Sequence, residues 1–237
     1  MKFKRICLCI SFVLLIIITT NATEVNAMNT GFSTEELSEE TKISFMSSIN
    51  LSQLSTEPKK SGILCFDVNE QGMIAVGQNG AQDKEICVYT SLGEFLYGYT
   101  FSCSQSFCVE WDEQYINIYF IRSDVIISLD SDGRVLDIKR VQDTIDNNSY
   151  RNSLYSMTRT VGNTTYLIRN DMGILNWITS SFSQIVTIDA TGTESIIYDV
   201  NSMQLTNAIV TISFISIFVL VAVAIIRWQF VKWKRGK

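Results

Sequence analysis

The sequence predicts a mainly β fold of antiparallel hairpins, with an N-terminal signal helix before it and a C-terminal transmembrane helix after it. Two uncharged apolar runs, at residues 6–18 and 208–226, lie near the two ends of the 237-residue chain. Between them, short β-rich runs alternate with polar turns that contain a glycine. These patterns divide the chain into a signal segment (1–27), a polar linker with a short amphipathic helix (28–61), a β domain (62–204), a transmembrane helix (205–227) and a basic tail (228–237).

The first apolar run has the features of a secretory signal peptide. Three basic residues precede it, and small residues follow it, so that Ala27 ends a plausible cleavage site. As a helix the run covers only about 20 Å, which is short of a hydrocarbon core of about 30 Å. We therefore expect cleavage near Ala27. An uncleaved signal anchor is the alternative, and it leaves the β domain on the same side of the membrane.

The second apolar run is long enough to cross a bilayer, because 19 residues without a charge span about 28 Å as a helix. Arg227 ends the run, and Trp228 and Trp233 lie where interfacial aromatic residues are found. We predict that these three residues anchor the helix at the membrane interface. The sequence thus predicts a protein that crosses the cell membrane once.

The charge distribution predicts the orientation. Residues 28–207 contain 23 acidic and 11 basic residues, a net charge of −12, whereas the last eleven residues contain five basic residues and no acidic one. Basic flanks stay in the cytoplasm, so we expect an extracytoplasmic main domain and a cytoplasmic C-terminus. A strongly acidic domain would repel phosphate groups, and nucleic acid is therefore not an expected partner.

The segment before the β domain predicts one helix and one linker. Ser33 and Glu36 have the spacing of a capping box, which favours a short amphipathic helix over residues 35–50. Residues 52–61 include Pro58, the only proline of the chain, and read as a loose tether.

Four hairpins are predicted in the β domain, because in each case two β-rich runs flank a short turn whose glycine supplies a positive φ angle. The paired runs are 63–68 with 73–76, 86–89 with 94–97, 125–129 with 134–136, and 185–188 with 193–197. Further strands are expected at 115–121 and 164–168.

The turns at residues 129–133 (Leu-Asp-Ser-Asp-Gly) and 188–192 (Ile-Asp-Ala-Thr-Gly) resemble those of β-propeller repeat proteins of the NHL and PQQ-like kind. The chain as a whole is similar in style to exported, membrane-anchored proteins of unknown function from Gram-positive bacteria. Gly93 and Gly133 are 40 residues apart, which is a propeller-blade period, but Gly133 and Gly192 are 59 apart, with a loop expected over residues 143–156. We expect an open antiparallel meander, and blades completed by another chain are the alternative.

The composition argues against catalysis and against a bound cofactor. The chain contains no histidine, which removes the usual nucleophilic triads, histidine-based zinc sites and the default general base at neutral pH. Asp130, Asp132 and Asp137 resemble a calcium loop only in part, because the EF-hand glutamate at position twelve is missing. An Asp-rich hairpin turn is the preferred interpretation. We expect no enzyme activity, no cofactor and no metal.

Two groups of residues in the β domain are candidates for special roles. Cys103 and Cys108 are close enough in sequence to close a small disulfide loop, although free buried thiols are an equal alternative for all four cysteines of the domain. Trp111, Tyr115 and Tyr119 lie in an aromatic-rich region that is either a recognition surface for sugars or proteins, or a set of cross-strand core pairs.

The sequence therefore predicts a membrane-anchored extracytoplasmic binding, sensory or interaction module without catalysis, with the lipid bilayer and a protein as its partners. An exported hydrolase that acts on wall polymers or peptides through carboxylates is one alternative. A structural subunit of a membrane complex is the other. The sequence does not identify the ligand.

Overall fold

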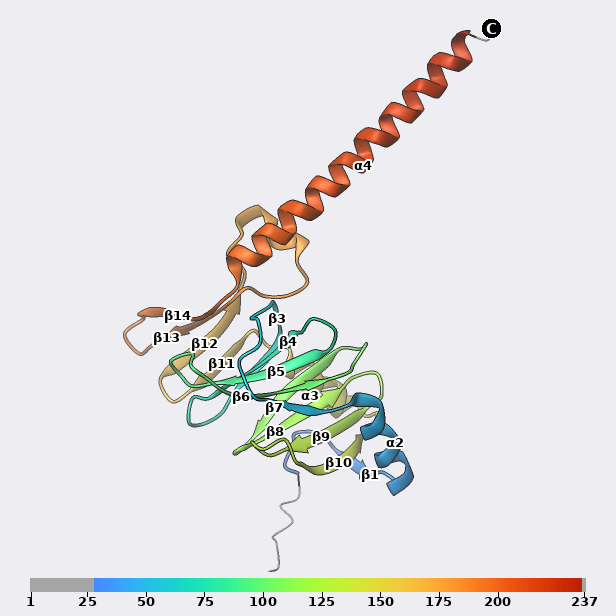
Figure 1. Cartoon of the computed structure of the whole chain (residues 1–237). Helices are drawn as coiled ribbons and strands as arrows, with labels where there is room; N and C mark the ends of the chain where they lie inside the picture. The colour runs from blue at the N-terminus through green and yellow to red at the C-terminus, as the bar shows by residue number, and fades with distance from the viewer. Residues whose placement is uncertain (1–27, 236–237) are drawn as a thin grey trace, which may run out of the picture.

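The computed structural model describes residues 28–235. The predicted signal peptide (1–27) and the last two residues of the tail lie outside this part of the chain. The described residues form three antiparallel sheets followed by one long C-terminal helix (Figure 1). The prediction of a mainly β, antiparallel fold with a C-terminal apolar helix is therefore confirmed.

Each sheet contains a meander of four consecutive strands. The first sheet contains β3 (Ile63–Val68), β4 (Ile74–Asn79), β5 (Lys84–Tyr89) and β6 (Phe95–Phe101). The second contains β7 (Phe107–Asp112), β8 (Tyr115–Phe120), β9 (Val125–Leu129) and β10 (Val135–Val141). The third contains β11 (Thr158–Val161), β12 (Thr164–Arg169), β13 (Gln184–Ile188) and β14 (Glu194–Asp199).

The four predicted hairpins share one turn geometry. In each turn a polar side chain accepts hydrogen bonds from the backbone N–H groups two and four residues later, and a glycine three residues later has a positive φ angle. The accepting residues are Asn69, Thr90, Asp130 and Asp189. This geometry explains the sequence pattern, because the side chain replaces a backbone acceptor and glycine adopts the left-handed conformation without strain. Asp130 thus belongs to a hairpin turn, as the preferred interpretation held.

The segment before the first sheet is more ordered than the sequence indicated. A strand, β1 (Thr34–Glu36), pairs with β10, and a second strand, β2 (Ser52–Leu54), pairs with β6. Between them lies α2 (Glu39–Ile49), whose N-cap is Ser38 rather than Ser33. The helix prediction is confirmed, but the capping box and the loose tether at residues 52–54 were wrong, because free sheet edges recruited both short segments.

The long interval between Gly133 and Gly192 contains two insertions rather than a loop. Helix α3 (Ile145–Leu154) connects the second and third sheets, and its N-cap Thr144 accepts a hydrogen bond from the backbone N–H of Asn147. A short 3-10 helix, η1 (Gly173–Ile178), lies between β12 and β13. Few side chains of α3 reach the core, so its sequence is mostly polar. It therefore lacks the apolar pattern that predicts a helix.

The first sheet lies between the other two. One core cluster joins the first and second sheets, and a second cluster joins the first and third sheets. The sheets meet through their first strands, since β7 lies against β3 and β4, and β11 contacts β3. Residues 28–235 do not form a closed ring of sheets, so a complete propeller is not observed in the described chain.

Helix α4 (Asn201–Arg235) leaves the third sheet and extends away from the domain (Figure 1). Within residues 28–235 it is the one helix that is long and apolar enough to span a membrane, with a candidate span of 29 residues and a mean hydropathy of 3.0. The most apolar 18-residue window of this span is not buried in the protein, whereas Gln204 and Ala208 at its start pack against the domain. Such an exposed apolar surface is consistent with single-pass membrane anchoring.

Candidate functional site

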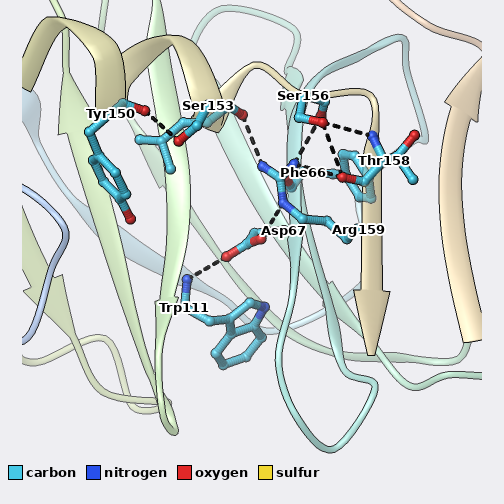
Figure 2. Close-up of polar contacts among 9 residues, drawn as sticks. Phe66, Asp67, Trp111, Tyr150, Ser153, Ser156, Thr158 and Arg159 are labelled. Carbon is cyan, nitrogen blue, oxygen red and sulfur yellow. Dashed lines mark hydrogen bonds and ion pairs between the residues drawn. The ribbon is translucent and has the colours of Figure 1, made fainter. Parts of the chain in front are cut away.

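Asp67 lies where the first strands of all three sheets meet. It is the fifth residue of β3, and its carboxylate bridges to the other two sheets. The backbone N–H of Trp111 on β7 donates to Oδ2 over 2.8 Å, and Nε of Arg159 on β11 donates to Oδ1 over 2.7 Å. Figure 2 shows this carboxylate between the two donors. One side chain therefore couples the three sheets.

Arg159 completes this junction on the side of the third sheet. Its guanidinium group also donates to the backbone carbonyls of Leu154 and Ser156, both over 3.0 Å, at the end of α3 (Figure 2). It lies over the Phe66 ring, 5.3 Å from the centroid. Because charged hydrogen bonds of fixed geometry hold the guanidinium on several sides, the junction forms a rigid base for the surface beside it.

A cavity of about 530 Å³ lies beside this junction, at the ends of β3 and β7. Its wall contains acidic residues from the ends of β3 and β7 and from the turns that follow these strands. Three residues with amide side chains also line it. The lining residues are Asn29, Asp67, Val68, Asn69, Glu70, Gln71, Trp111, Asp112 and Glu113. None of these lining residues is basic, but Arg159 neutralises Asp67 from behind the wall, so three carboxylates without a cationic partner and an indole ring line the cavity.

The N-terminal segment forms one side of the cavity. The backbone N–H of Asn29 donates to Oδ2 of Asp112 over 2.7 Å, and its carbonyl accepts from Nδ2 of Asn117 over 3.0 Å. The wall is therefore built from residues that are far apart in sequence. Asp67 and Asp112 already accept backbone hydrogen bonds, whereas Glu70 and Glu113 are exposed at the turns after β3 and β7.

Two donors in the cavity wall lack a partner. Asn69 is 4% exposed and uses its Oδ1 in the turn, but its Nδ2 has no hydrogen-bond partner, and Nε1 of Trp111 also has none. Unpartnered buried donors are costly, and a site that binds a polar ligand is one setting in which they occur. No group of three or more potential metal-ligating side chains occurs in residues 28–235. Because both unpartnered groups are N–H donors, the atom that would satisfy them is a hydrogen-bond acceptor such as a hydroxyl oxygen.

Glu110 lies close to the cavity but does not line it. Its carboxyl group is 7% exposed and accepts a hydrogen bond from Oγ1 of Thr30 over 3.0 Å. Burial raises the pKa of Glu110 to about 7, and hydrogen bonds with Thr30, Gly31 and Tyr150 offset only part of this effect. Glu110 is therefore buried and held by the N-terminal segment.

The predicted aromatic residues separate into different environments. Trp111 packs partly against the core and lines the cavity, so it is the one of the three that takes part in the candidate site. Tyr115 is half-buried at the start of β8. Tyr119 is 2% exposed, contacts Phe32 and donates its hydroxyl to Asp124, which agrees with the core alternative and not with a recognition surface. Alternation along β8 directs Tyr119 into the core beneath α3.

The candidate pair Cys103 and Cys108 does not form a disulfide in the structure, and Cys65 and Cys87 are also free, which agrees with the alternative of free thiols. Cys103 packs against the core between the first and second sheets, whereas Cys108 lies in the cluster on the other face of the second sheet. Burial raises the pKa of the Cys108 thiol to about 11 and that of Cys87 to about 12. These buried thiols therefore behave as small apolar side chains.

Arg227, Trp228 and Trp233 lie near the end of α4. Both indole rings are exposed, and Nζ of Lys232 lies 5.3 Å from the centroid of the Trp228 ring. Their positions just beyond the apolar residues agree with the interface prediction, which stays a prediction because no membrane is present.

Sequence reasoning did not single out Asp67, Arg159, Asn29 or Asn69. The one available signal was Asp67 itself, an acidic residue inside the apolar run Ile-Leu-Cys-Phe-Asp-Val, since a carboxylate in a buried strand requires a partner. Its partner Arg159 lies 92 residues away, in a strand of four residues without an apolar pattern. Comparison with protein-family models and with curated proteins finds no match for this chain.

Proposed function

We propose that this chain is a membrane-anchored extracytoplasmic binding module that holds a small cationic ligand in the cavity between β3 and β7. The cavity carries the proposal, because four acidic residues, three amides and one indole line it, and among the described residues only the carboxylate of Asp67 is paired with a basic side chain. Carboxylates attract an ammonium or guanidinium group, and the face of an indole ring adds a favourable cation–π interaction. Asp67 belongs both to the cavity wall and to the junction of the three sheets, so the junction fixes the position of one part of the site.

The architecture supports a role in binding. Three meanders with one shared turn type, joined through their first strands, favour the resemblance to β-propeller repeat proteins. Propeller-like assemblies of sheets place loops and strand ends around a common centre. Here the ends of β3 and β7 and the turns that follow them border the cavity, so ligand contact would be made by strand ends and short turns together.

Binding of organic cations to the full chain in detergent micelles tests the ligand class. We expect isothermal titration calorimetry to detect binding of a cation such as spermidine or lysine methyl ester, and no binding of acetate. The double variant E70Q/E113Q removes two exposed charges from the cavity rim without touching the junction. It should weaken binding about fivefold, since each exposed charge contributes about 0.5 kcal/mol.

The matched control is E39Q/E40Q, which removes two exposed charges from the first turn of α2. It should leave affinity unchanged, because α2 does not border the cavity. If both double variants weakened binding equally, the loss of affinity would be explained by the net charge of the protein and not by contacts in the cavity. Binding of neutral sugars with the same affinity as cations would contradict the proposed ligand class and favour recognition through hydroxyl groups.

The basic residues at the end of α4 support an extracytoplasmic orientation of the domain, since basic flanks remain in the cytoplasm. Protease added to intact cells should then digest residues 28–200 while a C-terminal epitope tag stays protected. Complete protection of the domain until the membrane is opened would place it in the cytoplasm and contradict the proposal.

A further inference from the structure

The segment between β12 and β13 has an unusual surface. It contains η1 (Gly173–Ile178), and Figure 1 shows this segment looping beside the first turns of α4. Two large apolar side chains of η1 point away from the protein, with Ile174 86% exposed and Trp177 82% exposed. Residues 172–188 contain no charged side chain. An apolar, uncharged projection of this kind indicates a surface that is covered by something else.

Hydrogen bonds hold both ends of this segment against the base of α4. On one side Nδ2 of Asn201 donates to the carbonyl of Asp171 over 2.8 Å. On the other, Nε2 of the buried Gln204 donates to Oγ of Ser181 over 3.1 Å and to the carbonyl of Phe182 over 2.9 Å. The segment is therefore attached at both ends to the first turn of the helix.

The position of these attachments places η1 near the start of the apolar run. The run begins at Ala208, four residues after Gln204, which corresponds to about 6 Å along the helix axis. A bilayer that surrounds the run would thus begin within a few ångströms of the attached segment. Tryptophan is enriched at this depth, because the indole ring is apolar while its N–H hydrogen-bonds at the headgroup level.

We propose that Ile174 and Trp177 of η1 insert into the headgroup region of the same bilayer that α4 crosses. This inference rests on the membrane anchoring of α4 and is independent of the ligand cavity. The partner is the lipid surface, because the segment is attached to the base of the apolar helix, and neither residues 172–188 nor residues 200–226 contain a charged side chain. The helix and the segment would form two points of attachment, which restrict the tilt of the β domain relative to the membrane.

Fluorescence quenching by brominated lipids tests the insertion on the full chain in phosphatidylcholine vesicles. In the W228F/W233F variant, Trp111 and Trp177 are the only tryptophans, and adding W177F isolates the contribution of Trp177 by difference. We expect lipids brominated near the headgroup end of the acyl chain to reduce the Trp177 signal at least twofold, and lipids brominated near the chain end to reduce it less. Trp111, within the β domain, should not be quenched.

A substitution within η1 provides a second measurement. I174D adds a charge to the proposed membrane contact and should reduce the quenching of Trp177, whereas I145D should not. Ile145 is the matched control, because it is 87% exposed and lies at the start of α3 beside the second sheet. Neither variant disturbs the core, since both isoleucines are exposed.

The same quenching measurement on the chain with all four tryptophans tests the anchoring of α4 separately from the insertion of η1. Quenching of Trp228 and Trp233 without quenching of Trp177 would overturn the inference and leave the anchor intact. A blue-shifted but unquenched Trp177 would also overturn it and indicate that a protein covers η1. If none of the three is quenched, the chain is not inserted, and both the anchor and the inference fail.

Discussion

Replacement of Asp67 by alanine is expected to lower the free energy of unfolding by about 3–5 kcal/mol. The side chains of Asp67 and Arg159 are only 15% and 16% exposed, so the variant leaves a largely buried guanidinium group without its carboxylate. It also removes the acceptor of the Trp111 backbone N–H. Because this one carboxylate joins the three sheets, its loss weakens contacts that no local hairpin replaces.

Denaturant titration of the full chain in detergent micelles, followed by tryptophan fluorescence, measures this change. D67N separates the two roles of the carboxylate, since an amide oxygen still accepts from Trp111 while the charge is lost. We expect D67N to be intermediate between the wild type and D67A. E194Q breaks the exposed ion pair between Arg169 and Glu194 and should change stability by less than about 1 kcal/mol. Similar effects of D67A and E194Q would contradict the role of the junction.

Replacement of Glu110 by glutamine is expected to remove a pH dependence of stability on the order of 3 kcal/mol. Burial raises the pKa of Glu110 from 4.5 to about 7 in the folded chain. Below about pH 4.5 the carboxyl group is protonated in both states, and its full contribution to stability is present. As the pH rises through about 7, the folded state has to ionise a buried carboxylate, so this contribution is lost.

The measurement compares the unfolding free energies of the wild type and E110Q between pH 4.5 and pH 8. Glutamine is nearly isosteric and remains neutral. The unfolding free energy of E110Q minus that of the wild type should therefore be larger at pH 8 than at pH 4.5. E113Q is the matched control, because Glu113 is exposed and lies in the following turn. A difference between the wild type and E110Q that does not vary with pH would contradict the raised pKa.

The hairpins and the membrane helix could be predicted because their causes are local. In each turn the polar residue and the glycine lie three residues apart, and one side chain satisfies two nearby backbone N–H groups. The apolar run of α4 needs no partner within the protein to be recognised. Helix α3 and the edge strands β1 and β2 were missed, because their apolar pattern is weak and a neighbouring sheet edge or a cap decides their structure.

In the candidate site, too, some features could be predicted from local sequence and others depend on tertiary packing. Trp111 and Tyr119 were singled out together because aromatic side chains are conspicuous, but the sequence left open which of them lies in the core, and Tyr119 does. Burial of this kind depends on which face of β8 meets α3, and local sequence does not contain that information. Burial likewise raises the pKa of Glu110, and the groups that hydrogen-bond to it belong to residues 30–31 and Tyr150, which lie about 80 residues before it and 40 residues after it.

The amino-acid sequence alone determined the β-hairpin character of the domain, its turn positions and the apolar C-terminal helix, since these depend on residues within a few positions of one another. Tertiary structure alone decided that Asp67 meets Arg159 across 92 residues, that Asn29 closes one side of the cavity, and that η1 lies against the base of α4. Such contacts depend on how whole sheets pack, and the free energy of packing is set by surfaces far apart in the chain.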